Sequence, residues 1–424
     1  MDGYAGRIVD DELDELLAGL PAISLEGPRG VGKTATAHRR AATTLALDDV
    51  NQVQLLVADP ARLDISPTPV LIDEWQRHPP VWDLVRRSVD RDASPGRFLL
   101  TGSATPTNAP THSGAGRIVQ LRMRPMSLAE RAVEQPTVSL RSLLTGAAPD
   151  IGGDTAVSLP DYADEIVRSG FPGILRLPAR ARRAQLDGYL SRIVEREFPE
   201  SGHPVRRPAT LRAWLRAYAA ATSTTTAYNA IPHAATPGET DKPAKTTTIG
   251  YRDVLTQLWL LEPVPGWLPA RNVSARLAQA PKHHVADPAL AARLLGMDTA
   301  ALLAGRDPAR AAAFEGPLLG ALFESLVTLS VRVYAQAAEA TVHHLRTRNG
   351  DHEVDLIVER DDGRVVAMEV KLSPSVGEAD VKHLRWLRER LEDHLLDSVV
   401  ITSGRHAYRR ADGIAVVPAA LLGA

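Results

Sequence analysis

The chain has 424 residues, of which 44% are hydrophobic and 24% charged, with a formal net charge of −2 and no cysteine. This length predicts about two to four domains with an ample core. The lack of cysteine excludes disulfides, thiolate zinc sites and cysteine nucleophiles. The net charge excludes a generally cationic nucleic-acid-binding protein, although local basic faces stay open. The start has no leader-like pattern and no apolar run approaches membrane-spanning length, so we expect a soluble cytoplasmic protein without a membrane partner.

A glycine-rich segment has the spacing G-x-x-x-x-G-K-[ST], between an apolar run at 22–25 and a helix-like run at 35–47. A strand, a glycine loop and a helix in this order surround a phosphate with backbone N–H groups, so the segment predicts nucleotide binding. Lys33 is then expected to reach the β- and γ-phosphates of ATP, and the Thr34 hydroxyl to bind Mg²⁺. The predicted nucleotide-binding residues are Gly27, Pro28, Arg29, Gly30, Val31, Gly32, Lys33 and Thr34.

Lysine is rare in this chain. Of the 49 basic residues only six are lysines, at positions 33, 242, 245, 282, 371 and 382. Because arginine takes nearly every general cationic role, a remaining lysine hints that a compact ammonium group is needed. Lys33 meets that need in the glycine loop, and Lys371 becomes of interest for the same reason.

After Asn51 the pattern alternates between strands predicted at 53–57, 70–72 and 97–101 and a helix at 80–90. This alternation predicts a parallel sheet with crossover helices, whose ligand lies at the carboxyl ends of the strands. Asp73 and Glu74 directly follow the strand at 70–72. We expect Asp73 to hold Mg²⁺, through water, and Glu74 to orient or deprotonate the attacking water.

Two further candidates follow along the chain. Either Thr101 or Ser103 could hydrogen-bond the γ-phosphate or the attacking water, although the segment is equally typical of an ordinary turn. Arg117 follows two glycines and precedes an apolar strand. It is a candidate arginine finger, within one chain or across an interface, and the alternative is a loop arginine that pairs with a surface acid.

Four segments resemble the AAA-type ATPase domain of a large bacterial and archaeal family. They read IDEWQ at 72–76, GRFLLTGS at 96–103, GAGRI at 114–118 and LRMRPMSLAE at 121–130. Trp75 departs from the β-branched aliphatic that is usual in the family, away from the predicted catalytic groups. The resemblance implies an ATPase joined to a C-terminal region with a winged-helix segment and a restriction-endonuclease-like fold.

The middle of the chain continues the resemblance. The segment SGFPG at 169–173 is similar to a glycine-rich motif of the family. A helix predicted at 178–198 carries Arg180, Arg182, Arg183, Arg192 and Arg196, which form either an anion-facing surface or an ordinary solvated face. Helices predicted at 209–221 and 249–261 match the family's winged helix, with a mobile loop near 223–247. Without a basic stripe, we favour a structural or protein-docking role for them.

The C-terminal part holds a second group of chemically suggestive residues. Glu324 lies on an apolar helix, Asp355 in a strand at 352–358, and Glu369 and Lys371 in a strand at 365–372 after a turn. Hairpin pairing and period-two alternation place Glu369 and Lys371 on one face. Asp355 and Glu369 could share a divalent ion while Lys371 positions or activates water.

This order of residues resembles the PD-(D/E)XK nuclease fold, with Glu324 as the helix acid and Val354 in place of the signature proline. The resemblance implies a possible nuclease-site Mg²⁺ at Glu324, Asp355 and Glu369, with Lys371. The alternative is an intact but catalytically silent scaffold.

Together these patterns predict an α/β chain with a P-loop parallel-sheet domain, a helical and winged-helix middle and a C-terminal restriction-endonuclease-like domain. The predicted domains are 1–135 (AAA-type P-loop ATPase), 136–204 (helical connector), 205–280 (winged-helix-like) and 281–424 (PD-(D/E)XK nuclease-like).

The favoured function is Mg²⁺-dependent ATP hydrolysis by Lys33, Asp73, Glu74, Ser103 and Arg117, coupled to DNA or a protein client through a conformational or oligomeric change. A homo-oligomer stays open. One alternative is a nucleotide-regulated DNA nuclease that uses Asp355, Glu369 and Lys371. The other is a slow ATP-bound signalling or scaffold switch.

Overall fold

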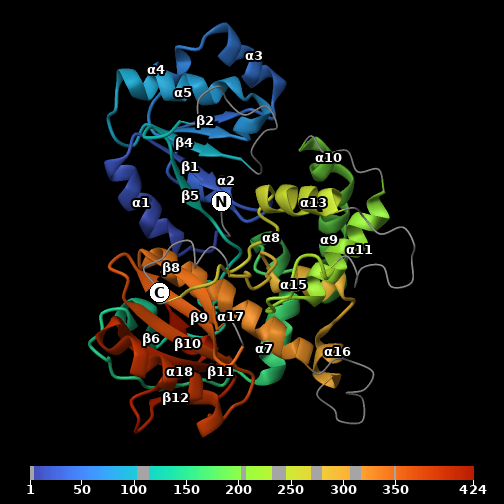
Figure 1. Cartoon of the computed structure of the whole chain (residues 1–424). Helices are drawn as coiled ribbons and strands as arrows, with labels where there is room; N and C mark the ends of the chain where they lie inside the picture. Colours follow the sequence, from blue (N-terminus) through green and yellow to red (C-terminus); the bar gives the residue numbers. More distant parts are fainter. Residues whose placement is uncertain are drawn as a thin grey trace.

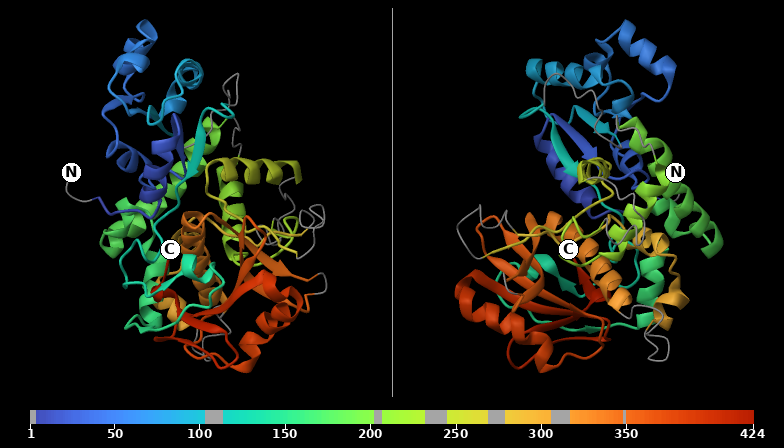
Figure 2. Two further views of the ribbon diagram at one scale, coloured as in Figure 1. Left: turned by 90° about the vertical axis from the view of Figure 1, so that its left-hand side faces the viewer. Right: turned by 45° about the vertical axis from the view of Figure 1, so that its right-hand side comes forward.

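The computed structural model describes residues 4–102, 114–201, 207–231, 245–268, 279–305, 317–347 and 350–424. They form an N-terminal sheet domain, a set of helices in the middle of the chain and a C-terminal sheet domain (Figure 1). The two turned views show the two sheet domains at opposite ends of the molecule, with the helices alongside (Figure 2).

The N-terminal sheet has five parallel strands in the order β2-β3-β4-β1-β5. Its strands are β1 (Ala22–Glu26), β2 (Thr43–Ala46), β3 (Val70–Asp73), β4 (Phe98–Thr101) and β5 (Val119–Arg122). Its helices are α1 (Val9–Gly19), α2 (Lys33–His38), α3 (Val50–Ala58), α4 (Arg62–Ile65) and α5 (Pro80–Arg91). The predicted parallel sheet, the strands at 70–72 and 97–101 and the helix at 80–90 are confirmed.

Two predicted elements of this domain are wrong. The helix expected over 35–47 ends at His38, and the chain then forms the edge strand β2. The strand expected at 53–57 is part of α3, because the Asp49 side chain accepts a hydrogen bond from the Asn51 amide at 2.9 Å and starts a helix there. On this helix Leu56 is buried while Leu55 and Val57 are exposed, as helical periodicity requires.

Alternate residues of the N-terminal strands point into two different cores. Leu71 and Leu99 belong to a large core that continues into the middle helices and the C-terminal domain. Ile72 and Leu100 face a separate core beneath α5, where Trp82 is buried. Since burying one such side chain contributes roughly 1.5–3 kcal/mol, both faces of this small sheet contribute strongly to its stability.

The middle of the chain is helical where the structure describes it. Its main helices are α7 (Leu159–Arg168), α8 (Pro172–Leu175), α9 (Ala179–Arg192), α10 (Phe198–Glu200), α11 (Pro208–Ala220), α13 (Lys245–Gln257), α15 (Pro288–Leu294) and α16 (Thr299–Ala304), with a π-helical turn, η2, at Ile193–Glu197. The helices expected at 178–198 and 209–221 are confirmed, and the one expected at 249–261 ends at Gln257. Residues 232–244 of the predicted mobile loop lie outside the described residues.

The C-terminal sheet has seven strands in the order β7-β12-β13-β11-β10-β9-β8. They are β7 (Gly153–Asp154), β8 (Ala340–Arg346), β9 (Glu353–Arg360), β10 (Val365–Lys371), β11 (Leu395–Thr402), β12 (His406–Arg409) and β13 (Ala415–Pro418). The expected hairpin is confirmed by the antiparallel pairing of β9 and β10, and β10 pairs in parallel with β11. Helix α18 (Glu378–Leu391) joins these two parallel strands.

The segment assigned from sequence to a helical connector contributes to this C-terminal part. β7 pairs with β12, while β6 (Val138–Ser139) pairs in parallel with β14 (Leu422–Gly423). The short helix α6 (Leu140–Leu143) follows β6. Residues 138–154 therefore belong to the C-terminal domain, although they precede the middle helices in the sequence.

Helix α17 (Pro317–Ala337) lies at the centre of the molecule (Figure 1). Among the described residues it is the one helix long and apolar enough to cross a membrane, but 72% of that apolar window is buried inside the protein. Ser330 and Tyr334 accept hydrogen bonds from the backbone amides of Leu128 and Ala129 at 3.1 Å. These contacts are those of a core helix that joins the two sheet domains.

Candidate functional site

The glycine loop lies between β1 and α2, as the sequence predicts. Gly32 has a φ of 106°, which side-chain-bearing residues rarely adopt. A Cβ built on Gly27 would lie 2.2 Å from the carbonyl oxygen of Met123, so no other residue fits there without a shift of the backbone. The conformation of the loop and its close packing against Met123 therefore require glycine at these two positions.

The Lys33 side chain is folded back onto this loop. Its Nζ donates to the carbonyl oxygens of Gly27 and Pro28 at 2.6 and 3.0 Å. Burial lowers the pKa of Lys33 to about 8, although the nearby carboxylate of Glu26 opposes this shift. Burial likewise raises the pKa of Glu26, which accepts a hydrogen bond from Ser24 at 2.8 Å. A buried ammonium group bonded only to carbonyl oxygens is ready to exchange them for phosphate oxygens.

Thr34 and Asp73 meet across the carboxyl edge of the sheet. Thr34 Oγ1 donates to Asp73 Oδ1 at 2.9 Å, and Thr101 donates to the same carboxylate oxygen. β4 lies between β1 and β3, and the register pairs Thr101 with both Leu25 and Asp73. A hydroxyl and a carboxylate are oxygen ligands of the kind that Mg²⁺ prefers, so these residues fit the ion that the sequence predicts.

Glu74 follows the end of β3 in an unusual conformation. Its backbone is left-handed, with φ 55° and ψ 40°, and its Oε2 accepts a hydrogen bond from Gln76 Nε2 at 2.6 Å. Left-handed backbone at a residue other than glycine is uncommon and clusters at active sites. The turn places Glu74 next to Asp73 at the carboxyl edge of the sheet.

Two candidates from the sequence do not join this group. Ser103 lies outside the described residues. Arg117 Nε forms a surface ion pair with Asp90 Oδ1 at 2.9 Å, with about half of the arginine side chain exposed. Within this chain Arg117 is therefore held at the end of α5.

Arg122, which the sequence analysis missed, occupies the same edge of the sheet. It is the last residue of β5 and pairs in register with Glu26, the last residue of β1. Its guanidinium lies over the Trp259 ring, 3.8 Å from the centroid, and makes no hydrogen bond among the described residues. Burial lowers the pKa of Arg122 to about 10. Arg122 lies within the family-like segment at 121–130, but its ring partner Trp259 is distant in sequence, so the motif gives no hint of this contact.

Glu262 contacts arginines from the N-terminal domain and from α17. Arg124 Nε lies 2.8 Å from Glu262 Oε1, Arg122 Nη2 lies 3.6 Å from the same oxygen, and Arg332 of α17 donates to the Glu262 carbonyl oxygen at 2.6 Å. Burial disfavours the charged carboxylate, but the three arginines together hold the pKa of Glu262 well below its usual range. The carboxylate thus links the N-terminal domain to α17.

The C-terminal acids converge on Lys282, another residue that the sequence analysis did not select. Lys282 Nζ lies 2.9 Å from Glu324 Oε1, 3.0 Å from Asp355 Oδ1 and 3.4 Å from Glu353 Oε1. The predicted Glu369 and Lys371 pair with each other at 2.7 Å. The only hint in the sequence is that Lys282 is one of the six lysines.

These acids do not fit the predicted nuclease metal. Among the described residues, no group of three or more His, Cys, Asp or Glu residues is placed to hold an ion. The ammonium group of Lys282 lies between Glu324 and Asp355, two of the three predicted ligands, and the third, Glu369, pairs with Lys371. Burial, and the charge of Asp355, raise the pKa of both Glu324 and Glu369.

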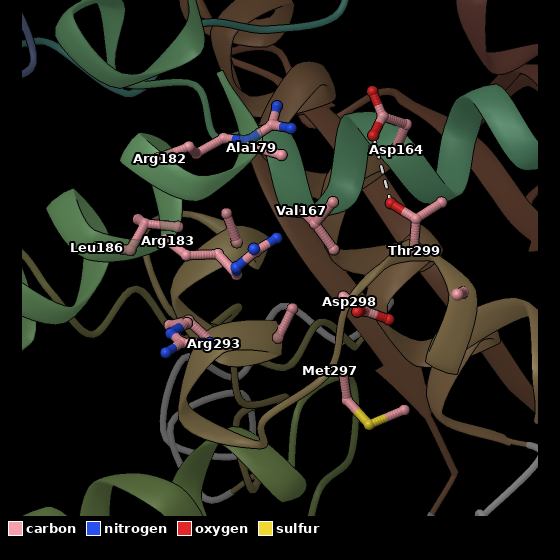
Figure 3. Close-up of a pocket in the computed structure, with 13 residues that line it drawn as sticks. Asp164, Val167, Ala179, Arg182, Arg183, Leu186, Arg293, Met297, Asp298 and Thr299 are labelled. Carbon is pink, nitrogen blue, oxygen red and sulfur yellow. Dashed lines mark hydrogen bonds between the residues drawn. The ribbon is translucent and has the colours of Figure 1, made fainter. Parts of the chain in front are cut away.

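A separate cavity of about 260 Å³ opens among α7, α9, α15 and α16 (Figure 3). Arg182 and Arg183, two arginines of the predicted anion-facing helix, line it. Asp164 and Asp298 line it as well, and Arg293 is already paired with a carboxylate of α9 at 2.6 Å. Because the charges balance, the cavity does not favour an anion.

Three family models match the chain. A model described as an AAA domain matches residues 20–132. Residues 20–132 are therefore similar in sequence to AAA domains, and they contain the glycine loop and the five-stranded parallel sheet described above. Residues 159–301 and 319–422 match two domains of unknown function, DUF8612 and DUF4143.

Two relatives match nearly the whole chain, and both are named as uncharacterized proteins. One protein of Mycobacterium bovis and one of Mycobacterium tuberculosis are each 29% identical over 412 residues, which cover 94% of this chain and 80% of theirs. A Walker-type ATPase of Pyrococcus abyssi aligns in structure over 67% of this chain and 94% of its own, with a TM-score of 0.39 and 16% identity. A score this low supports no conclusion about function.

Proposed function

We propose that this protein binds ATP with Mg²⁺ at the AAA domain and hydrolyses it. The observation that carries this proposal is the meeting of Thr34 and Asp73 at 2.9 Å, beside the buried Lys33 at the end of the glycine loop. A phosphate cradle, an ammonium group and two Mg²⁺ ligands are the parts that phosphoryl transfer requires.

Each side chain has one task in this scheme. Lys33 leaves the carbonyl oxygens of Gly27 and Pro28 and neutralises the β- and γ-phosphates. Thr34 and Asp73 hold the metal ion, whose chemistry is to withdraw negative charge from the phosphates. Glu74 orients the attacking water and accepts its proton.

In this proposal, nucleotide binding and hydrolysis in the AAA domain change the conformation of the rest of the chain through Arg122 and Glu262. Arg122 stands at the nucleotide edge of the sheet and has no hydrogen bond among the described residues, while its ring partner Trp259 and its nearest carboxylate, Glu262, lie in the segment after α13. A nucleotide phosphate competes with these weak contacts for the guanidinium. Nucleotide binding would then loosen the junction between the AAA domain and the middle of the chain.

The proposed client of this movement is DNA or a protein, held by the middle and C-terminal parts of the chain. The ATPase itself works either as a monomer or as a homo-oligomer. Measuring the hydrolysis rate with DNA, with RNA and without nucleic acid distinguishes these classes, because the client stimulates turnover. Arg117, which pairs with Asp90 at the surface, could act as the arginine finger of a neighbouring subunit in a homo-oligomer, or within its own chain if this exposed ion pair breaks. A slow nucleotide-bound switch is a second candidate, favoured by the Lys282 ion pairs in the nuclease-like site. Its expected signature is slow turnover with a nucleotide-dependent change in mass.

The variant Lys33→Ala tests the ATPase. We expect hydrolysis to fall by roughly 10²-fold or more, because the variant lacks the ammonium group that neutralises the transferred phosphate. The matched control is Lys382→Ala, which removes an exposed lysine of α18. Turnover in purified Lys33→Ala equal to that of the wild type would refute the assignment.

A further inference from the structure

The ammonium group of Lys282 is buried at the junction of three segments. Its side chain is 1% exposed and lies next to Glu324 from α17 and to Glu353 and Asp355 from β9. The backbone of Lys282 pairs with Val264 through N–H···O bonds of 2.8 and 2.9 Å in both directions. The position of the cation is therefore fixed by the fold.

Several of the surrounding carboxylate oxygens are already engaged. Asp355 uses Oδ1 for Lys282 and accepts a hydrogen bond from the Val370 amide on Oδ2 at 2.9 Å. Glu353 also lies 3.7 Å from Arg346, and Glu369 uses Oε2 for Lys371. The remaining oxygen, Glu369 Oε1, is buried and has no hydrogen bond among the described residues.

An ammonium group suits this geometry better than a divalent metal ion does. Lysine offers three N–H donors, which match the three carboxylates around it at 2.9, 3.0 and 3.4 Å. Mg²⁺ requires near-octahedral oxygen ligands and keeps several waters, for which the buried lysine leaves no room. A metal ion and Lys282 cannot both lie between Glu324 and Asp355.

We propose that Lys282 is a built-in cation that takes the place of a divalent metal in the C-terminal carboxylate cluster. The cluster then joins the segment before α15 to α17 and β9 as a metal-free ion-pair core. Its acids keep the arrangement of a latent divalent-cation site that only the loss of Lys282 would open. This inference does not depend on the ATPase activity proposed above.

Counting bound Mn²⁺ by electron paramagnetic resonance on the full-length, nucleotide-free protein tests the proposal. We expect the wild type and Asp355→Asn to bind the same number of Mn²⁺ ions, because the wild-type cluster holds none. Lys282→Ala leaves buried carboxylates without a counter-ion, so we expect about tenfold tighter Mn²⁺ binding or more than in the wild type, together with a rise in melting temperature on adding Mn²⁺. The double variant Lys282→Ala/Asp355→Asn should lose both effects.

Lys382→Ala, in which an exposed lysine is removed, is the matched control and should behave as the wild type does. Wild-type protein that binds Mn²⁺, with or without nucleotide, and loses it in Asp355→Asn would overturn the proposal. A folded Lys282→Ala that gains no Mn²⁺ would overturn the latent site. If Lys282→Ala does not fold, the comparison of wild type with Asp355→Asn still decides whether the cluster holds a metal.

Discussion

At the scale of single residues, the protonation of Lys33 makes the proposed nucleotide site sensitive to pH. Its ammonium group is buried against carbonyl oxygens of the glycine loop, and this burial lowers the pKa to about 8. Above that pH the unfolded chain holds one more proton at Lys33 than the folded protein does, up to the ordinary lysine pKa. The contribution of Lys33 to stability therefore rises with pH across this window, because the cost of burying the charge disappears.

ATP affinity is predicted to change in the opposite direction. Phosphate binds the charged lysine, so above about pH 8 each binding event must first take up a proton, and affinity should fall by up to about tenfold per pH unit. Calorimetry in buffers of different ionisation heat measures this proton uptake directly. Lys33→Arg provides the control, since its guanidinium stays charged. The same proton uptake in Lys33→Arg would assign the effect to another group, and no proton uptake in the wild type would contradict the prediction.

Glu74 is predicted to act in turnover and not in binding. Glu74→Gln keeps the side-chain volume but removes the proton acceptor, so hydrolysis should fall by about 10²–10⁴-fold while ATP affinity stays within a few fold. Single-turnover hydrolysis and fluorescent-nucleotide binding separate the two quantities. Glu378→Gln, on the exposed N-terminus of α18, is the control. Full turnover in Glu74→Gln would remove this residue from the mechanism.

At the scale of elements, the sequence predicts buried parallel strands well because they are short, continuous apolar runs. β3 and β4 are such runs, and all but the last residue of β3 are buried. Residues 53–57 have the same appearance, yet the Asp49 cap turns them into the helix α3, where Val50, Leu55 and Val57 stay exposed. A run of apolar residues cannot by itself separate these outcomes.

The candidate sites divide in the same way. Lys33, Thr34 and Asp73 could be predicted because a local motif or a strand end fixes their positions. Lys282 could not, because it lies 42 residues before Glu324 and 73 before Asp355, and only the tertiary fold brings them together. The E-x-K pattern correctly predicts that Glu369 and Lys371 share one face of a strand, but no local pattern shows that Lys282 lies beside the acids.

At the scale of the whole molecule, the N-terminal and C-terminal parts are joined by a shared core and by one charged junction. The large hydrophobic core runs without interruption from β1 through the middle helices into the C-terminal sheet. Glu262 lies at its edge, bound by Arg124 from the AAA domain and by Arg332 from α17. Electrostatic attraction there adds a specific orientation to non-directional hydrophobic contacts.

Glu262→Gln is predicted to weaken this junction strongly. The change leaves three largely buried arginines without their common carboxylate, which should cost about 3–5 kcal/mol of unfolding free energy. Urea unfolding followed by tryptophan fluorescence measures the loss, and Glu378→Gln, which removes a largely exposed carboxylate paired with Arg385 and Arg410, should change it little. If the junction is what makes the domains unfold together, the variant should also show two transitions, with ATP raising only the midpoint of the AAA domain. A single transition at the wild-type midpoint would mean that the hydrophobic core alone holds the domains together.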